Sequence, residues 1–254
     1  MTEMVPCLLN GKWNLTLPDH RAARPEWTTG WEVERLDAMH SVIQPGDTVI
    51  DVGAEEGDMS ALCAQWAGPD GNMILVEPNP KVWPNIRAIW EHNENLAPVL
   101  KWFVGFAARS TLLDPPKNDV NEFWNGLAGH AAWPNCAFGP LIDDHGFRQL
   151  YLEADATPTI RLDGLIVGPV DVITMDVEGS EMEVLAGARA ILSTWKPVVF
   201  VSIHPQFMVD QFDSHPLALY DYMWHDLGYK SEHLATDHEV HVVFWHPEAR
   251  LYQP

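Results

Sequence analysis

The sequence is poor in basic residues, in cysteine and in long hydrophobic runs. Its 254 residues include 15 Lys and Arg against 36 Asp and Glu, which gives a formal net charge of −21. Binding to a nucleic-acid backbone or an anionic membrane relies on clustered positive charge, so we expect neither partner. The three cysteines, Cys7, Cys63 and Cys136, have no disulfide-like or metal-site spacing, which fits a reducing compartment.

No stretch approaches the ~18 consecutive apolar residues of a transmembrane helix. The N-terminus also lacks the basic and apolar regions of a secretory signal, so we expect a cytoplasmic protein. Hydrophobic residues make up 46% of the chain, enough for one sizeable core at this length. We therefore treat 1–254 as a single domain.

Short β-branched runs alternate with helical patterns along the chain. Five runs bounded by turn residues are typical of strands buried on both faces: 48–52, 73–77, 99–104, 171–177 and 197–203. Three stretches between them have helical periodicity: 59–66, 82–90 and 180–195. This alternation predicts an α/β fold with a mostly parallel, doubly wound sheet.

Three further segments complete the predicted fold. Residues 229–235 and 239–245 flank a turn and predict an antiparallel hairpin at one edge of the sheet. Alternation in 240–245 places His241 opposite its apolar neighbours, so we expect solvated histidines there and not a zinc site. Residues 107–160 fit the alternation poorly and predict an insertion that forms a lid over the ligand. The N-terminal segment 1–45 leads into the fold through Trp31 and Glu32, before a helical stretch at 33–43.

The helical stretch 180–195 begins with a recognisable start signal. Ser180 and Glu183 have the spacing of a capping box, in which each side chain bonds the other residue's backbone N–H. We therefore expect one continuous helix from this point to Trp195.

The stretch VIDVGAEEGD, from Val49 to Asp58, joins a strand to a helix and contains a carboxylate and two glycines. Glycines at such a turn indicate a backbone built to approach a ligand closely, at the strand ends where ligands of these sheets bind. Glu77 ends the next strand, where an acid can accept both ribose hydroxyls of an adenosine. The alternative is that the glycines only make a tight turn and that Glu77 is a solvated strand end.

The glycine spacing differs from that of a dinucleotide site. Here the pattern is D-x-G-x-x-x-G and not G-x-G-x-x-G, and Glu55 and Glu56 occupy the turn. Negative charge at that place repels a pyrophosphate but tolerates ammonium and sulfonium groups. S-adenosylmethionine carries both groups, and we favour it as the cofactor.

A second motif, from Asp171 to Leu192, reads DVITMDVEGSEMEVLAGARAIL. With it the sequence resembles the FkbM family of S-adenosylmethionine-dependent methyltransferases over residues 31–204. The family patterns D-x-G-A-x-x-G, E-P and D-x-E-G-x-E, the last continuing to V-L-x-G-A, are matched by Asp51, Gly53, Ala54 and Gly57, by Glu77 and Pro78, and by Asp176, Glu178, Gly179, Glu181, Val184, Leu185, Gly187 and Ala188.

The resemblance implies a Rossmann-like class I methyltransferase fold with S-adenosylmethionine as cofactor. The cofactor residues that it implies are Asp51, Gly53, Ala54, Glu55, Gly57, Glu77, Pro78 and Asp176. Two positions depart from the family pattern. Thr174 stands where a lysine is usual, and Ser202 stands where a glutamate commonly precedes His204 by two residues. These departures bear on the polar groups around the methyl acceptor.

Methyl transfer to an alcohol needs the acceptor's proton to be removed, so a general base or a metal ion is useful. We assign Asp176 or His204 as the base, with Glu178 as its orienting partner. The alternatives are that Glu178 and Glu181 favour the helix N-terminus, and that His204 is an ordinary strand-end histidine. Asp176, Glu178 and His204 have ligand types compatible with a divalent ion such as Mg²⁺, but their spacing is not diagnostic. We assign no metal ligand.

The sequence therefore predicts O-methylation of a hydroxyl on a sugar, glycan or secondary metabolite, which makes the partner a small-molecule or carbohydrate acceptor. An N-methyltransferase on the same fold is one alternative. A non-catalytic module that retains the fold is another. Neither the acceptor nor the oligomeric state follows from a fold and a cofactor.

Overall fold

A computed structural model describes residues 3–79, 81–110, 159–165 and 168–249. A seven-stranded sheet in the order β10-β11-β9-β8-β3-β4-β5 forms its centre. Its parallel strands are β3 (Thr48–Val52), β4 (Asn72–Val76), β5 (Val99–Phe103), β8 (Val172–Asp176) and β9 (Val198–Ile203). β10 (Lys230–Thr236) and β11 (Val240–Trp245) form the antiparallel edge hairpin. The Rossmann-like fold and its edge hairpin are confirmed.

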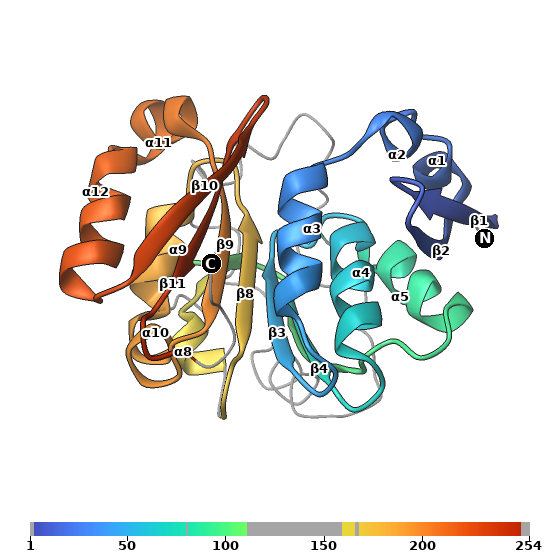
Figure 1. Ribbon diagram of the computed structural model, residues 1–254, viewed down its shortest axis with the longest axis horizontal. Coiled ribbons are helices and arrows are strands. Elements are labelled where there is room, and N and C mark those ends of the chain that lie inside the picture. The colour runs from blue at the N-terminus through green and yellow to red at the C-terminus, as the bar shows by residue number, and fades with distance from the viewer. Residues whose placement is uncertain (1–2, 80, 111–158, 166–167, 250–254) are drawn as a thin grey trace, which may run out of the picture.

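Helices cover both faces of the sheet, as Figure 1 shows. One face carries α3 (Val33–Val42), α4 (Asp58–Ala67) and α5 (Trp83–His92). The other carries α8 (Leu162–Leu165), α9 (Glu181–Gly187), α10 (Arg189–Thr194), α11 (Pro205–Phe212), α12 (Pro216–Asp221) and the π-helix η1 (Tyr222–Asp226). Each face has its own cluster of buried hydrophobic residues, because strands covered on both sides bury both sets of alternating side chains.

The stretch predicted as one helix over 180–195 is divided into α9 and α10. Ala188, at the junction, has φ −106° and ψ 12°, outside helical geometry. Just before it, a Cβ on Gly187 would collide with the backbone carbonyl of Ala108, so the helix packs tightly against the segment after β6. The capping box is also wrong, since Ser180 donates its hydroxyl hydrogen bond to the carbonyl of Val177.

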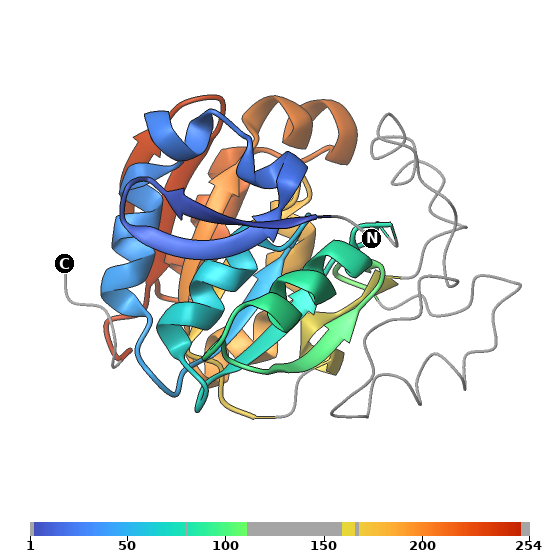
Figure 2. The same cartoon turned by 90° about the vertical axis from the view of Figure 1, so that its right-hand side faces the viewer.

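The N-terminal segment contains a hairpin that we did not predict. β1 (Met4–Leu9) pairs with β2 (Trp13–Pro18), and α1 (Asp19–Ala22) and α2 (Glu26–Thr29) follow. Figure 2 shows the dark-blue hairpin lying across the cyan and green helices, and Trp13 packs edge-on against Trp66 of α4 at 5.4 Å. This segment is therefore a packed part of the domain.

The prediction of a solvated His241 is wrong. Its side chain is buried, and its ring nitrogens lie 3.1 Å from the Ser202 hydroxyl and 3.3 Å from an Asp237 carboxylate oxygen. Alternation misled us because both faces of β11 are covered: Val243 belongs to one hydrophobic cluster and Val242 to the other. No metal is needed to explain a histidine in that position.

Only the two ends of the predicted insertion lie in the described residues. β6 (Phe106–Ala107) pairs in parallel with β7 (Thr159–Ile160). Residues 111–158 lie outside the described part, so the lid stays a prediction. Among the described helices, none combines the length and apolar character needed to cross a bilayer.

Candidate active site

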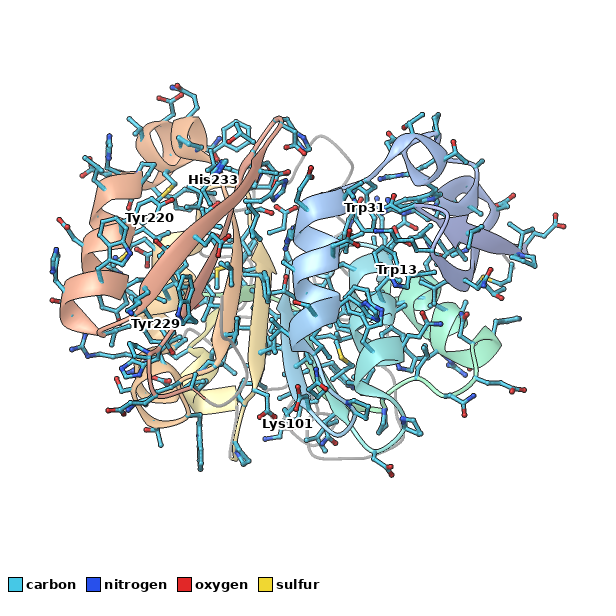
Figure 3. All side chains as sticks on the ribbon, viewed as in Figure 1. Trp13, Trp31, Lys101, Tyr220, Tyr229 and His233 are labelled. Carbon is cyan, nitrogen blue, oxygen red and sulfur yellow. The ribbon has the colours of Figure 1, made fainter. Side chains whose placement is uncertain are left out.

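A cavity of about 1010 Å³ lies at the carboxyl ends of β3, β4 and β8. It adjoins the point between β3 and β8 where the direction of strand succession reverses, the usual ligand position in such sheets. Its walls include almost all of the predicted cofactor residues, namely Asp51, Gly53, Ala54, Glu55, Glu77, Pro78 and Asp176, together with Glu178. Gly57 is not part of the wall. From the N-terminal side Trp31 also lines the cavity, and Figure 3 labels it beside the upper part of α3.

The two glycines of the turn after β3 have left-handed backbones, with φ of +82° at Gly53 and +91° at Gly57. A Cβ on Gly53 would collide with the carbonyl oxygen of Asp176, and one on Gly57 would lie 3.2 Å from the Ile86 side chain. The close approach that we attributed to a ligand is therefore made by the protein itself. Gly53 lets the end of β3 lie against the end of β8, which brings Asp51 and Asp176 to one cavity.

Two buried acids, Glu77 and Asp51, lie in the cavity wall. The Glu77 carboxylate accepts hydrogen bonds from the backbone amides of Glu55 at 2.9 Å and of Asn79 at 2.6 Å. Burial raises the pKa of Glu77 to about 8, although both amides act in the opposite direction. Burial likewise raises the pKa of Asp51 to about 6, against the hydrogen bond from Ser60. Each Glu77 oxygen keeps a second lone pair for a hydroxyl of a ligand.

The acids of the turn are partly neutralised by the N-terminal segment. Arg21, which is 1% exposed, donates to both Glu55 oxygens at 2.8 Å and to Asp58 at 2.6 Å. Glu56 lies 2.7 Å from a ring nitrogen of His20. Sequence reasoning missed these partners because they come from α1, which carried no recognisable pattern. The pairs tie α1 to the turn between β3 and α4.

The two departures from the family pattern share one partner, Arg35 of α3. Its guanidinium donates to the hydroxyls of Ser202 at 2.7 Å and Thr174 at 2.8 Å, and to Glu32 at 2.6 Å. The short hydroxyl side chains of Thr174 on β8 and Ser202 on β9 therefore leave room for the buried guanidinium of Arg35 from α3. The available signal was the position of Arg35 next to Leu36 and four residues before Met39, on the apolar face of α3.

His204 is oriented by Glu181 and not by Glu178. A Glu181 oxygen accepts from the ring Nδ1 of His204 at 2.9 Å and from the backbone amides of His204 and Gly179. Glu178 has a side chain that is 65% exposed, and its carboxylate lies 3.7 Å from the His204 Nε2. The predicted catalytic residues are thus close together. The buried acid that orients His204, however, is Glu181 and not the predicted Glu178.

A further buried acid, Glu239, completes the cluster around His204. Its carboxylate and that of Asp176 each lie 3.6 Å from the His204 Nε2. Burial alone would lower the pKa of His204, but Glu181, Glu239 and Asp176 outweigh it and raise that pKa to about 11. In this state the imidazole holds its proton near pH 7 and does not act as a base. Sequence reasoning missed Glu239, although an acid just before β11, which runs antiparallel to β9, lies at the same end of the sheet as His204.

Comparisons with known proteins identify the family and the fold. The sequence model of one protein family, the methyltransferase FkbM domain, matches residues 51–231. The crystal structure of methyltransferase FkbM from Methylobacillus flagellatus KT superposes with a TM-score of 0.50 at 17% identity, covering 83% of this chain and 50% of that one. The chain thus spans half the length of that structure, and at this identity the likeness shows the fold alone.

Two other solved structures are more distant. A precorrin-6y C5,15-methyltransferase from Geobacter metallireducens GS-15 has a TM-score of 0.46 and 13% identity, covering 89% of this chain and 95% of that one. A SAM-dependent methyltransferase from Aquifex aeolicus has a TM-score of 0.43 and 12% identity, with the same coverages of 89% and 95%. No curated protein sequence matches the chain.

Proposed function

The chain belongs to the FkbM methyltransferase family, and from that premise we propose that it transfers a methyl group from S-adenosylmethionine to a hydroxyl of a small-molecule or carbohydrate acceptor. The observation that carries the proposal is that one cavity is lined by both sets of predicted residues. Most of the residues predicted to hold the cofactor line it, and so do two of the predicted catalytic residues, Asp176 and Glu178. Donor and acceptor can therefore meet at the ends of β3 and β8.

The polar groups and the charge of the cavity wall suit the cofactor. Glu77 offers free lone pairs at the end of β4, where ribose hydroxyls can donate to them. The same wall contains Glu32, Asp51 and Glu178, and these acids suit a ligand whose sulfonium and ammonium groups are positive. When bound, S-adenosylmethionine supplies an activated methyl group and leaves as a neutral thioether.

Asp176 is the residue that we assign to take the acceptor's proton. It ends β8 in the cavity wall, and its side chain is 36% exposed, so an acceptor hydroxyl can reach it. Burial and the neighbouring charge of Glu239 raise the pKa of Asp176, which makes its carboxylate a stronger base when ionised. His204 acts through Asp176, as a positive group that Glu181 holds in place.

N-methylation is the second candidate, and the charge of the cavity favours it. The wall contains Glu26, Glu55, Glu56 and Glu239 besides the acids already named, which would attract a protonated amine. An amine acceptor depends less on a base, because its neutral form is already a nucleophile. The two candidates thus differ in how strongly turnover depends on Asp176.

The experiment begins with unbiased mass spectrometry of cell-extract components that gain a labelled methyl group from S-adenosylmethionine. With an acceptor identified, Asp176→Asn should lower turnover by ~10²–10⁴ for a hydroxyl, the range for losing a general base. Affinity for S-adenosylhomocysteine should stay nearly unchanged, and Glu91→Gln, on the exposed face of α5, is the matched control. Full turnover in Asp176→Asn would contradict the base assignment and favour an amine. Tight cofactor binding without any methylated product would favour a non-catalytic module.

A further inference from the structure

Side chains from three neighbouring strands converge at one end of the sheet. Asp176 ends β8, His204 follows β9 and Glu239 precedes β11, and these strands are adjacent in the sheet. One potential ligand atom from each side chain lies within 4.8 Å of the other two. We propose that Asp176, His204 and Glu239 bind one divalent metal ion.

The distances within the cluster suit a shared ion better than direct hydrogen bonds. The carboxylates of Asp176 and Glu239 both lie 3.6 Å from the same atom, the His204 Nε2. That separation is long for a hydrogen bond, whose N···O distance is about 2.7–3.2 Å. Ligand atoms bound to one ion at about 2.0–2.2 Å lie about 3–3.6 Å from each other. The three side chains therefore need only small adjustments to surround an ion.

The imidazole of His204 is fixed in the orientation that a metal ligand requires. Its Nδ1 donates to the Glu181 carboxylate at 2.9 Å, and its ring stacks on Phe207 with an interplanar angle of 5°. The Nε2 therefore faces Asp176 and Glu239. An ion that binds there takes the place of the proton that Nε2 carries in the metal-free chain. A carboxylate that holds the far nitrogen of a histidine is the usual support of a histidine–metal bond.

A buried acceptor in the cluster has an oxygen atom without a hydrogen-bond donor, which is a second observation that suits a cation site. Glu239 is 5% exposed, and its Oε2 has no hydrogen-bond partner within the described part of the chain. Its other oxygen lies 2.7 Å from the exposed His238. A buried carboxylate oxygen without a partner is costly, and a bound cation removes that cost.

The set of one imidazole nitrogen and two carboxylates favours Mn²⁺ or Zn²⁺ over Mg²⁺, which prefers oxygen ligands alone. The set also differs from the combination considered in the sequence, because Glu239 takes the place of the exposed Glu178. Asp176 and Glu239 both reach the cavity wall, so the ion would face an acceptor bound there. With the ion bound, Asp176 would serve as its ligand, and the ion would lower the pKa of an acceptor hydroxyl, a role that rests on the proposed function.

The test is a metal titration of the full chain without an affinity tag, after treatment with a chelator. Free Mn²⁺ is followed by electron paramagnetic resonance and Zn²⁺ by calorimetry. The wild-type chain should bind one ion, and Glu239→Gln should weaken binding by about tenfold or more. Glu26→Gln, which changes a carboxylate elsewhere in the same cavity wall, should bind the ion like the wild type.

Binding of S-adenosylhomocysteine, measured on the same samples, shows whether each variant is folded. If Glu239→Gln does not fold, the wild-type titration and His204→Gln decide the question. A wild-type chain that binds neither ion in a defined ratio overturns the proposal, as does a folded Glu239→Gln that binds as tightly as the wild type. A chain that binds the ion but methylates nothing supports the metal site and contradicts the proposed function, so the two failures are distinct.

Discussion

Glu77 is a buried acid that shapes a turn and also faces the ligand cavity. Its oxygens accept from the amides of Glu55 and Asn79, so both segments depend on the carboxylate. Replacement by glutamine would set an amide N–H against one of these backbone N–H groups. The side chain is thus specified by the turn as well as by the proposed ribose contact.

Cofactor affinity should rise with pH because of Glu77. Its pKa of about 8 in the free protein means that it is largely protonated at pH 7, whereas ribose hydroxyls donate best to the ionised form. Calorimetry with S-adenosylhomocysteine should therefore show affinity that increases from pH 7 to pH 9. Glu77→Ala should remove most of that trend and cost about 1–3 kcal/mol of binding free energy, because buried polar groups lose their partner.

The stability of the unliganded protein should follow the opposite trend. The pKa of Glu77 is raised in the folded chain from an ordinary value of 4.5, so the folded state binds the proton more tightly than the unfolded state. Its stabilising contribution is complete below the ordinary pKa and is lost as the pH rises through about 8. The melting temperature of the unliganded protein, measured at pH 6 and pH 9, checks this trend and serves as the control for the affinity measurements. Affinity that does not change with pH would mean that Glu77 does not contact the ligand in its ionised form.

Among the elements, α1 holds the turn between β3 and α4. Arg21 is buried against Asp58 and Glu55, whereas its neighbour Arg24 has a side chain that is 41% exposed and lies 3.5 Å from Glu55. The two arginines therefore contact the same turn from buried and exposed positions. Substituting each of them in turn therefore tests how the N-terminal segment supports this turn.

Arg21→Ala should destabilise the domain by about 3 kcal/mol, because it leaves the buried Asp58 carboxylate without its cation. It should also weaken S-adenosylhomocysteine binding, since Glu55 lies in the cavity wall. Arg24→Ala should change the free energy of unfolding by less than about 1 kcal/mol, the usual worth of an exposed ion pair. Chemical denaturation measures both. Equal effects of the two substitutions would mean that burial of Arg21 does not matter.

The strands of the sheet were predictable because turn residues bound short β-branched runs. β3, β4, β5, β8 and β9 each lie within a residue or two of the predicted ranges. The β1–β2 hairpin was missed although Asn10-Gly11, a strong hairpin signal, lies in its turn. The buried His241 was missed because alternation does not tell a solvated face from one that a helix covers.

The candidate site was predictable where contacts follow from strand order, and not where they come from distant segments. Asp51, Glu77 and Asp176 end parallel strands, so topology alone brings them to one edge. Arg21 and Arg35 reach the site from the N-terminal segment. Their pairing depends on tertiary packing that no local pattern reports.

For the whole molecule, the cavity and the complete chain both carry an excess of acidic residues. The formal charge of −21 is spread over a protein whose proposed cofactor is positive at two groups. Acids dominate the wall, and the buried arginines nearby are already paired with Glu32, Glu55 and Asp58. The electrostatics of the molecule therefore favour a cationic ligand over an anionic dinucleotide.

Isothermal titration calorimetry of the wild-type chain with S-adenosylhomocysteine, followed by competition with NAD, tests this claim most directly. The turn after β3 lacks close-set glycines and carries Glu55 and Glu56, which disfavour a pyrophosphate. We predict that S-adenosylhomocysteine binds at one site per chain and that NAD does not displace it. A chain that binds NAD and ignores S-adenosylhomocysteine would contradict the account.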